Sequence, residues 1–91
     1  MTSSGALGPT PHAAVEVHLF AAARAAVGAA VVEAPAGPLS SILDRLEAEH
    51  PGFSGVRARC SFLVDEVAVH GENADVPSGS RVDVLPPFAG G

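Results

Sequence analysis

The sequence predicts one small α+β domain in which a mixed sheet of about five strands packs on one main helix. Three observations carry this prediction. A chain of 91 residues has room for a single hydrophobic core. Short segments of alternating or β-branched apolar residues lie on both sides of one clear amphipathic helix pattern. Glycine and proline separate these segments, as expected at turns between short elements.

The first expected strand covers residues 15–20 (VEVHLF), where apolar Val15, Val17 and Leu19 alternate with the other side chains. This alternation places the ring of Phe20 on the face opposite the core, as an exposed contact residue. Residues 21–27 (AAARAAV) favour a short helix.

A second strand is expected around residues 29–34, after a C-terminal helix cap at Gly28, and it pairs with the first strand as a hairpin. The main helix follows, with apolar residues at 39, 42, 43 and 46 along one side. Pro38 suits its first position, and Pro51-Gly52 ends it after His50.

The rest of the domain is expected to be mostly strand and turn. Residues 53–59 are predicted to form an irregular connection, followed by strands at 60–64 and 67–69 that join through Asp65-Glu66. The segment 70–80 is rich in turn residues. The last strand is expected at 81–85, where a pair of prolines ends it because proline cannot donate to a strand ladder.

Composition narrows the function classes. Five basic against ten acidic side chains give a net charge of −5, which disfavours nucleic acid as a partner because that affinity depends on neutralising phosphates. All the basic residues are arginine, so the chain has no lysine that could be modified. The single cysteine, Cys60, cannot close an intrachain disulfide, which favours a cytoplasmic location. Neither a secretory signal nor an apolar stretch near the ~18 residues of a membrane span is present, so no membrane partner is expected.

Residues of the usual catalytic sets are scarce. The histidines lack metal-ligand spacing, so no metal site is expected, and no glycine-rich nucleotide motif occurs. Asp65 and Glu66 are neighbours that suit a polar hairpin turn better than a converging acid/base pair. Cys60 is assigned to the core or the sheet edge, because nothing in its surroundings along the chain lowers its pKa.

The segment after the last strand is the most informative part of the sequence. It reads Pro86-Pro87-Phe88-Ala89-Gly90-Gly91. Two prolines keep its start extended, and a diglycine has no side chain that blocks entry into a narrow active site. At the other end, residues 1–13 are rich in Ser, Thr, Gly and Pro and have almost no large apolar side chain. We therefore expect a disordered leader (1–13), a folded domain (14–87) and a flexible tail (88–91).

These residues resemble the small subunit of molybdopterin synthase, a family of sulfur carriers in molybdenum-cofactor biosynthesis. Its members end in Pro-Pro-x-x-Gly-Gly on a ubiquitin-like β-grasp fold. The resemblance covers about residues 15–91 and includes the segment 17–24 (VHLFAAAR) followed by Gly28, the helix 39–49, and the tail. The leading segment narrows the match to this branch, and the resemblance favours a functional role for Arg24 and Gly28 more than composition alone does.

The resemblance implies a mechanism in which the chain supplies an atom rather than catalysis. An ATP-using, E1-like enzyme adenylates the Gly91 carboxylate, and a persulfide sulfurtransferase converts it to a thiocarboxylate. The tail then enters the large catalytic subunit, where the sulfur builds the dithiolene of molybdopterin. The chain would thus be a non-catalytic, sulfur-donating subunit that has no active site of its own and binds no cofactor directly.

Geometry and resemblance together predict a docking surface. Phe20, Ala68 and Leu85 are expected to form an apolar patch beside the tail. The further expected partner contacts are Arg24, Pro86, Pro87 and Phe88, and the inserted tail is Ala89, Gly90 and Gly91.

The chain departs from the family pattern in two turns. Asp65 stands where the family usually has asparagine, and Ser78-Gly79-Ser80 replaces an Asp-Gly-Asp turn. All these residues suit turns, so we expect the fold to survive and some acidic partner contacts to be lost.

Three alternatives stay open. A sulfur carrier for thiazole or cysteine synthesis would keep the fold and the diglycine but serve another acceptor. A protein modifier would join its activated C-terminus to a lysine of a target. A non-catalytic β-grasp adaptor would bind through its sheet and make no use of the terminus.

Overall fold

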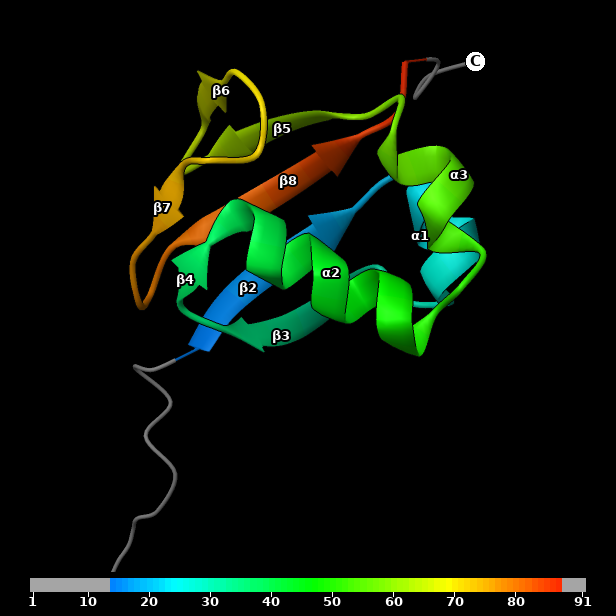
Figure 1. The fold of residues 1–91 in the computed structure, drawn as a ribbon, viewed down its shortest axis with the longest axis horizontal. Helices are drawn as coiled ribbons and strands as arrows, with labels where there is room; N and C mark the ends of the chain where they lie inside the picture. The colour runs from blue at the N-terminus through cyan, green and yellow to red at the C-terminus, as the bar shows by residue number, and fades with distance from the viewer. Residues whose placement is uncertain (1–13, 88–91) are drawn as a thin grey trace, which may run out of the picture.

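The computed structural model describes residues 14–87, so the predicted leader (1–13) and tail (88–91) lie outside the described residues. Five strands form one mixed sheet in the order β3-β2-β8-β5-β6 (Figure 1). Their bounds are β2 Ala14–Leu19, β3 Val31–Pro35, β5 Ser61–Val64, β6 Val67–Val69 and β8 Arg81–Leu85. The α+β prediction and its five-stranded sheet are confirmed.

Two strands from opposite ends of the chain form the centre of the sheet. β2 and β8 pair in parallel, with Val17 opposite Val82, and β3 pairs antiparallel with β2, as the predicted hairpin-like arrangement requires. On the other side, β5 pairs antiparallel with both β8 and β6. The tail therefore continues from a strand that has neighbours on both sides, which holds its starting point firmly.

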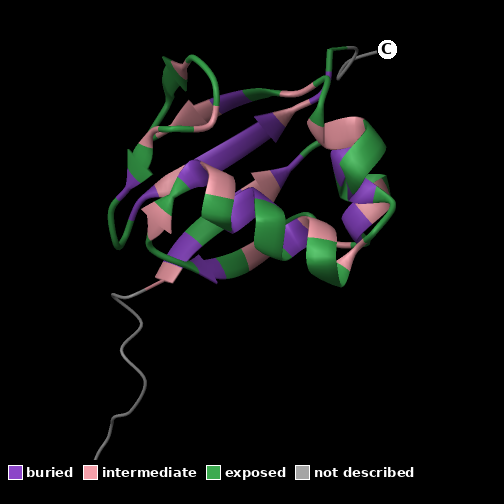
Figure 2. Ribbon diagram, in the orientation of Figure 1, coloured by how far each residue is buried: buried purple, intermediate pink, exposed green. Residues whose placement is uncertain are grey.

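One face of the sheet is buried under α2 (Leu39–Glu49), which crosses in front of the strands in Figure 1. The alternation expected in the first strand is confirmed, because Val15, Val17 and Leu19 are all buried in β2. Figure 2 shows the central strand β8 as buried over most of its length, which fits its position between two neighbouring strands. Other buried side chains that complete the core include Leu39, Ile42, Leu43, Leu46, Phe53, Phe62, Val76, Val82 and Val84.

The main helix begins one residue later than predicted. Pro38 is its N-cap in extended conformation, and Leu39 is the first helical residue. The free amides of Leu39 and Ser40 donate to the carbonyls of Ala74 and Glu72, at 2.8 and 2.9 Å. A loop from the turn-rich segment therefore satisfies backbone groups that a helix start leaves unpaired.

That turn-rich segment, 70–80, contains a strand that the sequence did not indicate. β7 (Asp75–Val76) pairs antiparallel with β4 (Gly37–Pro38) in a separate two-stranded sheet. Strands of two residues show no alternation, and only the burial of Val76 ties this pair to the core.

The prediction of an irregular connection at 53–59 is wrong. Residues Phe53–Arg57 form a third helix, α3, which packs beside α1 (Ala21–Val27) at one end of the sheet (Figure 1). The short helix at 21–27 is confirmed, and Gly28 caps it with a φ of 85° that favours glycine. No helix among residues 14–87 is long and apolar enough to cross a membrane.

Candidate functional site

The root of the tail is built into the domain. The last residue of β8 is Leu85, so the prolines end the strand as predicted. Pro86 is buried, whereas Pro87 is exposed. The residues expected to act in the tail, namely Phe88, Ala89, Gly90 and Gly91, lie outside the described residues.

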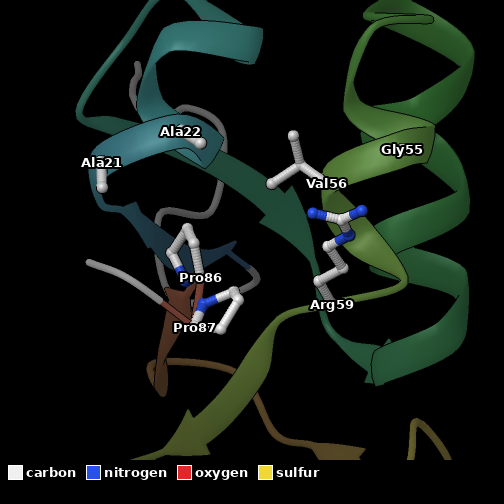
Figure 3. A pocket seen from close by; sticks show the side chains of 7 residues that line it. All are labelled: Ala21, Ala22, Gly55, Val56, Arg59, Pro86 and Pro87. Atoms are coloured by element: carbon white, nitrogen blue, oxygen red, sulfur yellow. The ribbon is translucent and has the colours of Figure 1, made fainter. Parts of the chain in front are cut away.

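A groove lies at this root, between α1, α3 and the two prolines (Figure 3). Its volume is about 170 Å³. We call it the tail-root groove. It is lined by Ala21, Ala22, Gly55, Val56 and Arg59, together with Pro86 and Pro87.

Arg59 is the charged residue of the tail-root groove, and sequence reasoning missed it. Figure 3 shows its guanidinium beside Val56 on the α3 side, while the two alanines and the prolines form the opposite side. The groove exists because Phe53–Arg57 is helical, so the mistaken prediction of an irregular connection there also concealed the groove. A signal was present, since Phe53 and Val56 have the i, i+3 spacing of one helix face.

The open face of the sheet, opposite α2, carries an apolar patch next to the tail root. Leu19 and Val84 are paired and face the core, so Phe20 and Leu85 directly after them point to the open face. The amide of Phe20 still donates to the Val84 carbonyl at 3.3 Å, which extends the ladder to Phe20. Phe20 is 37% exposed, in agreement with the orientation predicted for its ring.

Ala68 lies on the same face. Ala68 pairs with Leu63, and Leu63 pairs with Asp83 of β8. Asp83 lies between Val82 and Val84, which face the core, so Asp83 and the two residues paired in line with it face the open side. The register thus places Phe20, Ala68 and Leu85 on one face, as predicted, and adds Leu63, which was not anticipated. These four residues are the open-face patch.

A polar strip borders the open-face patch on the central strands. The Arg81 Nε donates to Asp83 at 2.7 Å, and the Asp83 side chain is only 8% exposed although it lies on the open face. On the neighbouring strand His18 and Glu16 approach to 3.0 Å. The ion pair with Arg81 compensates the burial of the Asp83 carboxylate.

The two turns that depart from the family pattern contact each other. The Asp65 carboxylate accepts a hydrogen bond from the Arg81 amide at 2.9 Å and one from the Ser80 hydroxyl at 2.8 Å. These two bonds lower the pKa of Asp65. Asp65 and Glu66 have positive φ angles of 49° and 70°, as a two-residue hairpin loop requires. The predicted polar hairpin turn is therefore confirmed, and Asp65 links it by hydrogen bonds to Ser80 and Arg81.

The remaining candidates are less informative. Arg24 is exposed on α1, two residues after Ala22 of the groove. Cys60 is half-buried, donates to the Val56 carbonyl at 3.2 Å, and has a thiol pKa that burial raises, so it is held as an inert thiol. No group of three or more His, Cys, Asp or Glu side chains in the described range 14–87 could hold a metal ion.

Comparison with known proteins decides the family. The family model described as the ThiS family matches residues 17–91. The chain belongs to the ThiS family. No curated protein sequence matches it significantly.

Solved structures show the fold of this ThiS-family chain. It is similar to small archaeal modifier protein 1 from Methanosarcina acetivorans, with a TM-score of 0.75 and 21% identity over 87% of this chain and 97% of that one. It is also similar to a protein assigned as molybdopterin converting factor subunit 1 from Pyrococcus furiosus, with a TM-score of 0.71 and 22% identity over 82% of this chain and 98% of that one. A third similar structure is a chain in the complex of subunits 1 and 2 of molybdopterin-converting factor from Helicobacter pylori. Its TM-score is 0.64, with 20% identity over 86% of this chain and 99% of that one. The β-grasp fold expected from the tail and leading segment is thereby confirmed.

Proposed function

We propose that this ThiS-family chain is a sulfur carrier of molybdenum-cofactor biosynthesis whose active group is the Gly91 carboxylate. The observation that carries the proposal is the placement of the tail root. The central strand β8 leads directly into Pro86 and Pro87, which line the tail-root groove, and Leu85 of the open-face patch is the last residue of that strand. The family match that extends through Gly91 supports the same role for the tail.

Chemistry at Gly91 requires an activating partner. A carboxylate is a poor electrophile, so an E1-like enzyme joins one of its oxygens to the α-phosphorus of ATP and pyrophosphate leaves. The terminal sulfur of a persulfide donor then attacks the acyl carbon and displaces AMP. A second thiol reduces the resulting acyl disulfide and releases the thiocarboxylate.

The partner that consumes the sulfur is the large catalytic subunit of molybdopterin synthase in this proposal. The open-face patch supports it, because Phe20 is an exposed aromatic residue next to the tail root, and aromatic residues dominate interface energetics. Similarity to a subunit that is solved in complex with subunit 2 of molybdopterin-converting factor also supports it. Phe88 would add a second aromatic anchor just before the glycines.

A second candidate is a protein modifier, which the similarity to a small archaeal modifier protein favours. The activation step is the same, but a target lysine attacks the acyl carbon in place of sulfur. The chain has no lysine of its own, so such a modifier would not form lysine-linked chains with itself.

Reconstitution separates the two candidates. The untagged thiocarboxylated chain is incubated with the large subunit and cyclic pyranopterin monophosphate, and we expect molybdopterin to form while the chain returns to its carboxylate. Deletion of Gly91, or extension beyond it, should abolish this transfer and leave the far-UV circular dichroism unchanged. Covalent adducts on lysines of other proteins, without dithiolene formation, would instead establish the modifier.

A further inference from the structure

The chemistry proposed at Gly91 assigns no role to the side chains that line the tail-root groove. Its surface is mostly small or apolar, and it carries one guanidinium, that of Arg59. Val56 is half-buried and Pro86 is buried, which gives the groove a fixed floor, whereas Ala21 and Ala22 are exposed at its edge. A groove of this kind fits a protein side chain rather than a polar small molecule.

Most arginines of this chain form ion pairs within residues 14–87, but Arg59 does not. Arg57 pairs with three carboxylates, Arg81 with Asp83, and Arg45 with Glu49. Within residues 14–87 no carboxylate lies within 4.0 Å of the Arg59 side chain, although the chain carries a net charge of −5. An exposed guanidinium beside apolar surface is suited to bind a carboxylate through two parallel hydrogen bonds.

We propose that the tail-root groove binds an acidic segment of the adenylating enzyme. In that segment an Asp or Glu side chain pairs with Arg59, and a small apolar side chain next to it fills the groove. This inference rests on the proposed function, and specifically on adenylation of Gly91, the step that carrier and modifier share. The four residues that follow Pro87 and end at Gly91 can span at most roughly 14 Å. An enzyme that holds the Gly91 carboxylate must therefore come close to the groove, whose wall includes Pro87.

Charge complementarity predicts which kinetic constant responds. Arg59 would contribute to docking and take no part in the reaction at Gly91, so its loss should affect KM and leave kcat unchanged. A reversed charge should repel the acidic segment, and its effect should weaken at high salt, because exposed charges are screened.

The experiment measures ATP–pyrophosphate exchange by the adenylating enzyme as a function of chain concentration, for the full chain and for Arg59→Glu. Arg45→Glu is the matched control, because it makes the same charge change on α2, outside the groove. We expect Arg59→Glu to raise KM by about tenfold or more with kcat within about twofold, and Arg45→Glu to stay within about twofold in both. Equal melting curves for both variants establish that the fold is retained.

Four results would contradict the inference. Equal KM values for Arg59→Glu and Arg45→Glu, whether unchanged or raised relative to wild type, overturn the docking site. A fall in kcat at unchanged KM also overturns it, because Arg59 would then act on the reaction itself. A lower KM for Arg59→Glu overturns it as well, and would point to the chain's own terminal segment as the ligand of the groove. Absence of exchange with wild type, using an enzyme proven active on another carrier, contradicts the proposed function itself and the inference with it.

Discussion

Arg57 is predicted to be the most important ion-pairing residue for the stability of the domain. It lies on α3, is only 15% exposed, and donates four hydrogen bonds to the carboxylates of Glu72, Asp44 and Glu47. Both nitrogens facing Glu72 bind it, at 2.6 and 3.1 Å, so that pair is bidentate. These bonds raise the pKa of Arg57 and tie α3 both to α2 and to the loop that caps the start of α2.

The size of the effect follows from the exposure of the partners. Asp44 is 71% exposed and contributes little, whereas Glu72 is 30% and Glu47 is 40% exposed. We expect Arg57→Met, which keeps the aliphatic stem, to lower the free energy of unfolding by about 2–4 kcal/mol. In a domain of this size that corresponds to a fall in melting temperature on the order of 10–20 °C.

Urea unfolding followed by far-UV circular dichroism is the suitable assay, because the chain has no tryptophan or tyrosine. Arg45→Met is the control, since Arg45 pairs with Glu49 at 3.7 Å and both side chains are more than half exposed. The control should lose less than about 0.5 kcal/mol. A loss for Arg57→Met no larger than that of the control would refute the reasoning.

Three further predictions concern the turn and the open face. Glu66→Gly should stabilise the domain by about 1 kcal/mol in the same urea assay, because Glu66 has a φ of 70° that glycine adopts without strain; a destabilised variant would contradict this. The hydrogen bonds that lower the pKa of Asp65 stabilise the fold at pH values above the ordinary carboxyl pKa of ~4. This contribution is lost as the pH falls through the lowered pKa of the folded state. Asp65→Asn should therefore lose less stability between neutral and acid pH than wild type, and an equal loss would rule out the contribution. Phe20→Asp should weaken binding of the large subunit by about tenfold or more in calorimetry, while Val31→Asp, exposed on edge strand β3 of the same face, should bind normally; tight binding by Phe20→Asp would remove this residue from the interface.

Much of the fold could be predicted because its main elements have strong periodicity. Val15, Val17 and Leu19 alternate over a whole strand, and α2 shows its apolar side over three turns. Elements that depend on distant contacts have only weak local signals in the sequence. Helix α3 has five residues with Gly55 at its centre, so its local helix propensity is poor, and burial of Phe53 together with the ion pairs of Arg57 stabilises it.

The candidate site shows the same division. Geometry and resemblance together grouped Phe20, Ala68 and Leu85, and the strand register puts all three on the same face of the sheet. Arg59 could not be singled out, because composition does not tell which arginine lacks an acidic neighbour. Arg57, two residues earlier, is held by three carboxylates, and only the folded arrangement of α2, α3 and the following loop separates the two roles.

The central claim is that Gly91 carries sulfur, and the intact mass of the chain tests it most directly. The untagged chain is incubated with an E1-like adenylating enzyme, ATP and a persulfide donor, and the C-terminal peptide is then analysed by mass spectrometry. We predict a mass increase equal to the replacement of one oxygen by sulfur, confined to the peptide that contains Gly91. An unchanged terminal peptide, with an activating system that is competent on another carrier, would contradict the account.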